Sequence, residues 1–412
     1  MQKPVLEMDF EPDCLAAFDV LRGALIDLYA SVGADPNSPQ DAARRFRVNK
    51  TLTWNISKVI GSNDPIASLP SVPGSSALRS LLQAMQKEGA SSEVVGRVRD
   101  AAKALHGIVE MHVGDRATLE LVVDGMGKRR EDHLELSRKL AFRGNSGIWG
   151  VQARTRLMSV LMAPNADDED MIDMAIVRGY IGFRRLRTDV RWPIFQLRGW
   201  GEEGLMTSMW EALDPEGNRP GGLPLLQRFS TVKACELEEV RTASGRDYML
   251  ASGPIGNTGA VDCYVSDCAK AAASKYRTGE DTTGEFGATI SAPTERLVFD
   301  LLVDERLAFA LTPEVRAFGG VFHERSEQAV PEGQLPIPVS QSVVALPGQP
   351  PAIATPAAPG YPEIVNFAQE RMGWKSERLK GCRLEMSYPP LGSTVLLRFK
   401  LPERPTANQK NG

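Results

Sequence analysis

The spacing of the hydrophobic residues changes once along the chain, near Gly144–Gly147, and this change constrains the fold class. Before it, apolar residues recur every three or four positions, as in Leu78–Met85, which is typical of one face of an α-helix. After it, apolar and polar residues alternate from Trp149 to Leu157, which indicates a half-buried β-strand. The pattern predicts an α+β multidomain protein: an all-helical domain first, then a mixed domain with a mostly antiparallel sheet.

The domain boundaries follow from the same patterns. The chain has 412 residues, enough for two or three domains that each bury a core. Residues 1–140 are predicted to form the helical domain, and residues 146–328 the α+β domain. Residues 330–362 contain nine prolines and are predicted to be an extended connector. Residues 363–403 are expected to form a small C-terminal segment with one helix and two strands.

Residues Pro39–Ile60 predict two short helices with a break near Arg47–Asn49. Ser38 is placed to begin the first helix as its N-cap, with Pro39 at the first helical position. On the second helix, Leu52, Ile56 and Val59 share one face. Polar side chains occupy the remaining positions and are the types that contact base edges and phosphates.

This arrangement, and in particular the run Ala43–Thr51 (Ala-Arg-Arg-Phe-Arg-Val-Asn-Lys-Thr), resembles the helix-turn-helix of bacterial transcription regulators. The resemblance implies that the second helix enters the major groove of double-stranded DNA and that the first grips the backbone. The candidate DNA-binding residues are therefore Arg44, Arg45, Asn49, Lys50, Thr51, Thr53, Asn55 and Lys58.

The sequence departs from the family pattern at two positions. The family usually has glycine at the turn, where this chain has Arg47, so the turn requires either a positive φ at Arg47 or a different geometry. The position at which the family places a β-branched apolar residue to lock the two helices together is Thr53.

The charge of the whole chain and that of the helix pair have opposite signs. The formal net charge is -4 and the pI is about 5.8, which argues against a protein covered in basic residues. Within Pro39–Ile60, however, five arginines and lysines face one aspartate. Because phosphate contacts need only a local basic face, the acidic total is compatible with DNA binding.

The five cysteines are scattered and show no zinc-ligand spacing, so we predict free thiols and neither a metal nor a cofactor. The first ten residues are charged and contain no apolar run, and no stretch reaches the roughly 20 apolar residues of a membrane span. These features predict a cytoplasmic protein without membrane contact.

The sequence hypothesis is a cytoplasmic bacterial DNA-binding regulator, with no catalytic motif, that forms a homo-oligomer. Its second domain would bind a protein or a small-molecule effector, or dimerise. Three alternatives stay open. The helix pair is part of an ordinary helical domain with a solvated basic face; or the chain is a non-catalytic assembly or scaffold protein whose helical domain binds protein; or residues 146–328 form an enzyme, which would require a concave pocket with perturbed titratable groups.

Overall fold

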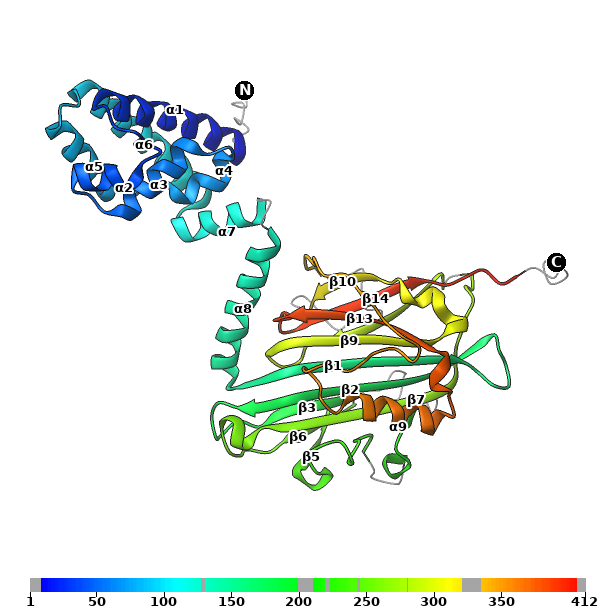
Figure 1. Ribbon diagram of the computed structural model, residues 1–412. Helices are drawn as coiled ribbons and strands as arrows, with labels where there is room; N and C mark the ends of the chain where they lie inside the picture. Colours follow the sequence, from blue (N-terminus) through cyan, green and yellow to red (C-terminus); the bar gives the residue numbers. More distant parts are fainter. Residues whose placement is uncertain are drawn as a thin grey trace, which may run out of the picture. The chain divides into compact units, whose positions relative to one another are not determined.

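A computed structural model describes residues 9–126, 130–198, 210–218, 223–242, 245–279, 281–320 and 335–405. The chain divides into two compact units, Met1–Leu134 and Glu135–Gly412 (Figure 1). The first is helical and the second is dominated by strands, so the predicted α+β class with a mostly antiparallel sheet is confirmed.

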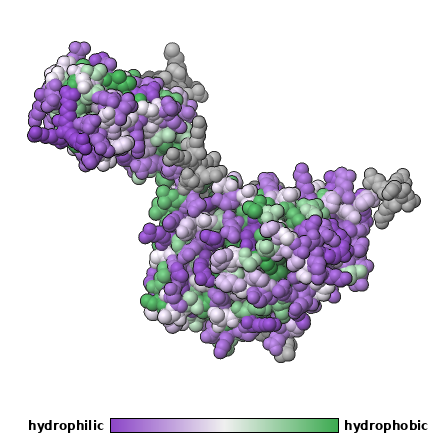
Figure 2. Space-filling view, viewed as in Figure 1, coloured by the Kyte–Doolittle hydropathy of each residue, from purple (hydrophilic) through white to green (hydrophobic). Residues whose placement is uncertain are grey.

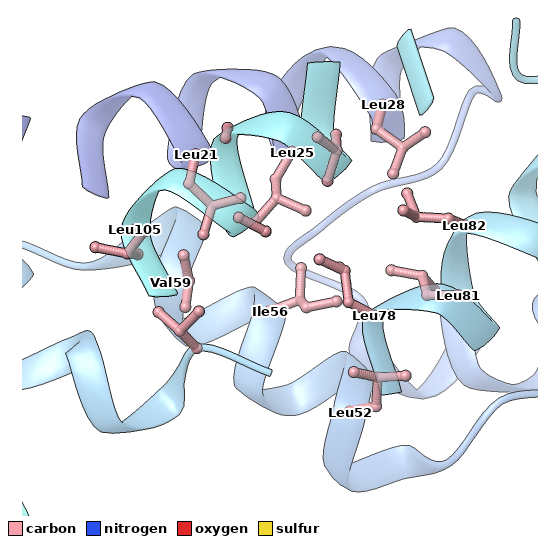
Figure 3. Packing of buried hydrophobic residues seen from close by; sticks show 14 of the residues in the cluster. Leu21, Leu25, Leu28, Leu52, Ile56, Val59, Leu78, Leu81, Leu82 and Leu105 are labelled. Carbon is pink, nitrogen blue, oxygen red and sulfur yellow. The ribbon is translucent and has the colours of Figure 1, made fainter. Parts of the chain in front are cut away.

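The first unit is a bundle of short and medium helices. Its elements are α1 (Phe10–Ser31), α2 (Pro39–Phe46), α3 (Lys50–Gly61), α4 (Pro65–Ser68), α5 (Ser75–Lys87), α6 (Ser92–Val113) and α7 (Arg116–Met126). One apolar face of each longer helix turns inward, and Leu25 of α1, Ile56 of α3 and Leu81 of α5 are fully buried in a common core (Figure 3). This core holds α3 in place from behind.

Helix α8 (Arg130–Trp149) extends further than the sequence pattern predicted. The expected strand began at Trp149, but this residue ends the helix, and β1 begins at Val151. Gly150 joins the two with a positive φ of 70°, and a Cβ there would lie 2.8 Å from Nε of Arg187. Gly150 permits the sharp change of direction between α8 and β1. The alternation of polar and apolar residues does not register this turn, and it therefore placed the start of the strand too early.

The second unit contains three sheets among its described residues. The largest has the order β12-β13-β9-β1-β2-β7-β4. Its strands are β1 (Val151–Pro164), β2 (Met171–Arg185), β4 (Glu211–Ala212), β7 (Val261–Ser274), β9 (Thr294–Asp304), β12 (Val344–Leu346) and β13 (Leu379–Ser387). β1 and β9 run parallel, whereas the other neighbouring strands of this sheet are antiparallel.

The two smaller sheets are antiparallel. A four-stranded sheet has the order β11-β10-β14-β8, and its strands are β8 (Thr283–Thr289), β10 (Glu314–Gly319), β11 (Leu335–Pro336) and β14 (Ser393–Lys400). A three-stranded sheet has the order β3-β6-β5, with β3 (Trp192–Arg198), β5 (Leu237–Thr242) and β6 (Gly245–Leu250).

The large sheet is covered on both faces. Even-numbered residues of β1 such as Met158 and Val160 pack with residues of the four-stranded sheet. Odd-numbered residues such as Leu157 and Leu161 pack with helix α9 (Tyr361–Met372), which lies over the sheet in Figure 1. The polar–apolar alternation in the sequence therefore describes only the first half of β1, because the second half is buried on both sides.

The C-terminal residues do not form a separate segment, contrary to the predicted division at 363–403. Strand β13 pairs with β9 in the large sheet, β14 lies between β10 and β8, and α9 covers the large sheet. The connector predicted at 330–362 begins outside the described residues; from 335 onward it contributes β11 and β12 to two sheets. Such long-range pairing has no local sequence signal.

Candidate nucleic-acid interface

The turn between α2 and α3 has a left-handed residue at the end of α2 and an N-cap at the start of α3. Arg47 ends α2 in the left-handed conformation, with φ 53° and ψ 42°, and its N–H donates to the carbonyl of Ala43. Asn49 begins α3, and its side-chain oxygen accepts a hydrogen bond from the N–H of Thr51 at 2.7 Å. The chain therefore makes the turn with a positive φ at Arg47, the first of the two geometries that the sequence allowed.

The outer face of α3 is polar with one aromatic residue at its centre. Leu52, Ile56 and Val59 are buried against the core. On the opposite side Lys50, Trp54 and Lys58 follow one another at intervals of four residues and are exposed, with Trp54 48% exposed. Residues four apart lie on one helix face. We name this row of three residues the α3 ridge.

Thr53 does not belong to this surface. It was predicted as a DNA contact, but it is only 1% exposed, and its hydroxyl donates to the carbonyl of Lys50 at 2.9 Å. This position points into the core because it lies beside Leu52 and Ile56 on the inner face. Thr53 is therefore part of the buried inner face of α3 and is not exposed for contact with a partner.

The two arginines of α2 differ in their contacts. Arg44 is exposed and forms an ion pair with Asp41 at 3.5 Å, with both side chains about three-quarters exposed. Arg45 donates to the carbonyls of Val32 and Gly33, at 2.7 and 3.2 Å, at the C-terminal end of α1. Arg45 therefore holds α2 against α1, whereas Arg44 is engaged only in an exposed ion pair within its own helix.

A groove of about 990 Å³ lies beside the N-terminal half of α3. Asn49, Thr51 and Asn55 line one side of it, and residues of α5 line another. Its charged lining residues are Arg45, Arg47, Lys87, Arg116 and Glu88. Four cations against one anion make the groove basic, and the surface around α2 and α5 is strongly hydrophilic in Figure 2.

Sequence analysis missed three basic residues of this groove. Arg47 was counted in the local positive charge but was not a candidate contact, and Lys87 and Arg116 belong to helices that are distant in the sequence. The guanidinium of Arg116 donates to the carbonyl of Pro70 and lies 3.4 Å from Glu120. No local pattern identifies Lys87 or Arg116, because only the packing of α5 and α7 brings them beside α3.

Two other features bear on the kind of site. No group of three or more histidine, cysteine, aspartate or glutamate side chains that could hold a metal ion occurs in the part of the chain that the structure describes. Within those same residues, no helix is long and apolar enough to cross a membrane.

Comparisons with known proteins add no family. No family model matches the sequence, and no curated protein matches it. Among solved structures, the chain is similar to the crystal structure of a candidate protease from Parabacteroides distasonis, with 7% identity and a TM-score of 0.26 over 61% of this chain. The chain spans 41% of the length of that protein. A similarity at this TM-score carries no argument about fold or activity.

Proposed function

We propose that this protein is a cytoplasmic regulator that binds double-stranded DNA through α2 and α3. The observation that carries the proposal is the α3 ridge, a polar helix face presented to solvent and held from behind by Leu52, Ile56 and Val59. A recognition helix needs this combination of a rigid apolar inner face and an exposed polar outer face.

The charges around the ridge support a phosphate partner. Lys50 and Lys58 stand at its two ends, and the basic groove begins beside it at Arg47. In the proposed complex the ridge contacts the major groove of the duplex, while Arg44, Arg47 and Arg116 contact the sugar–phosphate backbone. Asn55 is placed to pair with an adenine edge, and Lys50 with guanine or a phosphate.

A DNA-bound form of this protein is expected to be a homo-oligomer, because one small module binds weakly and two half-sites supply specificity. In this proposal the strand-rich second unit dimerises or binds an effector, and the acidic surface elsewhere suppresses non-specific sticking to nucleic acid.

A second candidate function is favoured by the shape of the groove. Its apolar lining residues include Phe46, Leu52 and Ala84 beside the charged ones, and a groove with such a mixed lining also suits a peptide helix. In that case the protein is a scaffold whose helical unit binds protein. The two functions differ in salt dependence, because apolar docking is far less sensitive to salt than phosphate binding.

Fluorescence anisotropy with a mixed-sequence DNA duplex tests the proposal. A protein that contacts about four phosphates loses roughly 100-fold in affinity between about 50 and 200 mM salt. The double variant Lys50→Ala, Asn55→Ala removes one phosphate contact and one base contact, and is expected to bind about 10-fold more weakly than the native chain.

Two control variants make the result specific. Lys103→Ala removes one charge from the exposed side of α6, away from the groove, and should change affinity by less than about 2-fold. Thr53→Val alters α3 itself but at a buried position, and should also leave affinity unchanged. If the native chain shows no binding at low salt, or if Lys103→Ala weakens binding as much as the double variant, the DNA proposal is wrong.

A further inference from the structure

A second hollow, of about 450 Å³, lies within the strand-rich unit. Its floor is one face of the large sheet, where the strand register places Arg156 of β1 opposite Tyr180 of β2, and Tyr180 opposite Cys263 of β7. Its walls come from β3 and from β8, the edge strand of the four-stranded sheet. The volume falls within the range of small-molecule sites. We name this hollow the β1–β7 cavity.

Arg156 gives the β1–β7 cavity an uncompensated positive charge. Its Nε donates to the carbonyl of Thr289 at 3.3 Å, and its Nη1 donates to those of Leu157 and Gly179 at 3.1 and 3.2 Å. The guanidinium lies 5.0 Å from the ring centre of Tyr180. Among the described residues it has no carboxylate partner, and its Nη2 makes no hydrogen bond. Burial lowers the pKa of Arg156, which is expected of a cation without a paired anion.

The other charges in the cavity cancel each other. Arg178 donates to the carboxylate of Asp267, which is only 8% exposed. Burial raises the pKa of Asp267, and the pairing with Arg178 opposes that change. The cavity therefore contains two guanidinium groups and one carboxylate, which leaves Arg156 as the group that a bound anion would neutralise.

The remaining lining combines hydroxyl groups with aromatic rings. The hydroxyls of Tyr180 and Ser291 lie 2.8 Å apart and are hydrogen-bonded. Phe195 is stacked on Tyr248, with ring centres 4.4 Å apart and planes 17° apart, so its orientation is fixed. Trp210 adds a second ring. Aromatic side chains beside one cation suit a flat apolar molecule that carries a single anionic group.

The buried thiol in the cavity argues for binding and against thiol chemistry. Burial raises the pKa of Cys263 to about 12, so the thiol stays protonated. A protonated thiol is a weak nucleophile, and its side chain is only 3% exposed.

We propose that the β1–β7 cavity binds an organic monoanion with a flat aromatic body, its carboxylate held by Arg156 and its ring packed against Phe195 and Trp210. This inference does not rest on DNA binding, because every residue of the cavity belongs to the second unit. It also names the chemical class of effector that a regulator with this unit would sense.

Ligand-observed NMR on the full chain tests the proposal with a matched pair of probes. 2-Naphthylacetate carries the charge, and 2-naphthylacetamide has the same shape without it. The acid should bind saturably, and the amide about 10- to 100-fold more weakly, because a hydrogen-bonded ion pair distinguishes the two. Arg156→Gln should abolish this preference, whereas Arg296→Gln, an exposed arginine of the same sheet paired with Glu385, should preserve it.

Arg156 also bridges strands through its carbonyl contacts, so Arg156→Gln is checked by circular dichroism. If the Arg156→Gln variant unfolds, a second variant, Thr289→Trp, tests the proposal instead. Thr289 is an exposed residue of β8 that lines the cavity, so a tryptophan there should exclude both probes without changing the core. The proposal is wrong if neither probe binds up to about 10 mM, if acid and amide bind equally, or if Thr289→Trp leaves binding unchanged. Anisotropy with DNA, measured on the same protein preparations, tests DNA binding independently of binding in the cavity.

Discussion

At the scale of single residues, Arg47 combines backbone strain with a surface charge. Its φ of 53° lies in the left-handed region, which costs an L-residue other than glycine roughly 1–2 kcal/mol. Its side chain is exposed at the rim of the basic groove. A residue kept in a strained conformation at a charged surface is a candidate for function, because glycine would make the same turn at lower cost.

Arg47→Gly is therefore expected to separate stability from binding. Relief of the strain should raise the free energy of unfolding of the helical unit by about 0.5–1 kcal/mol, after allowance for the greater freedom of glycine in the unfolded chain. Loss of the charge should weaken DNA binding. Urea unfolding and anisotropy measure the two effects. Asparagine tolerates the left-handed region but lacks the charge, so the control variant Arg47→Asn should weaken DNA binding to a similar extent. A lower free energy of unfolding in Arg47→Gly than in the native chain would contradict the strain argument.

At the scale of elements, hydrogen bonds to Asp304 connect the end of β9 to the 3₁₀ helix that follows it. Asp304 begins a short 3₁₀ helix, Glu305–Leu311, and accepts hydrogen bonds from the backbone N–H of Arg306 at 3.0 Å and from its Nε at 2.8 Å. Burial alone would raise the pKa of Asp304, but these hydrogen bonds and the charge of Arg306 outweigh it, so the pKa falls below its ordinary value of 3.8.

The lowered pKa makes this contribution pH-dependent in a defined direction. Because the folded state favours the ionised carboxylate, Asp304 stabilises the fold above pH 3.8, and this contribution disappears as the pH falls through the lower folded-state value. Asp304→Asn should lower the free energy of unfolding by about 2 kcal/mol near pH 7, and the difference from the native chain should shrink as the pH falls below 3.8. A difference in urea unfolding that is equal at both pH values would contradict the assignment.

At the scale of the whole molecule, the described residues of the two units bury separate hydrophobic clusters, one in the first unit and three in the second, with no residue in common. The first gathers α1 to α7, and the second unit packs its large sheet between the four-stranded sheet and α9. Separate cores predict two cooperative unfolding transitions, since each unit loses its own buried surface when it unfolds.

Ile56→Ala is expected to shift only one of these transitions. Ile56 is fully buried in the helical unit, so its truncation should cost that unit about 2–5 kcal/mol. Leu301→Ala, at a fully buried position of β9, should shift only the other transition. Differential scanning calorimetry of the two variants tests this, and a single transition that both substitutions lower equally would show that the units unfold together.

The sequence by itself determined the features that depend on near neighbours in the chain. The change of hydrophobic period predicted helices followed by strands, although it placed the boundary at Trp149 rather than after it. The helix pair at Pro39–Ile60, and the requirement for a positive φ at Arg47 or a different turn, also followed from local residues. These signals are readable because helix periodicity and turn geometry depend on residues within a few positions of each other.

Tertiary structure decided the features that depend on distant residues. It placed β13 beside β9, turned Thr53 inward, and used Arg45 to hold α1. It also assembled the basic groove from four helices, α2, α3, α5 and α7, and the β1–β7 cavity from strands as much as a hundred residues apart or more. The register of the strands and the lining of the groove arise from long-range packing, and a single sequence carries no periodic signal for such packing. The candidate DNA-binding surface was therefore only partly predictable from the sequence, and the β1–β7 cavity was not predictable at all.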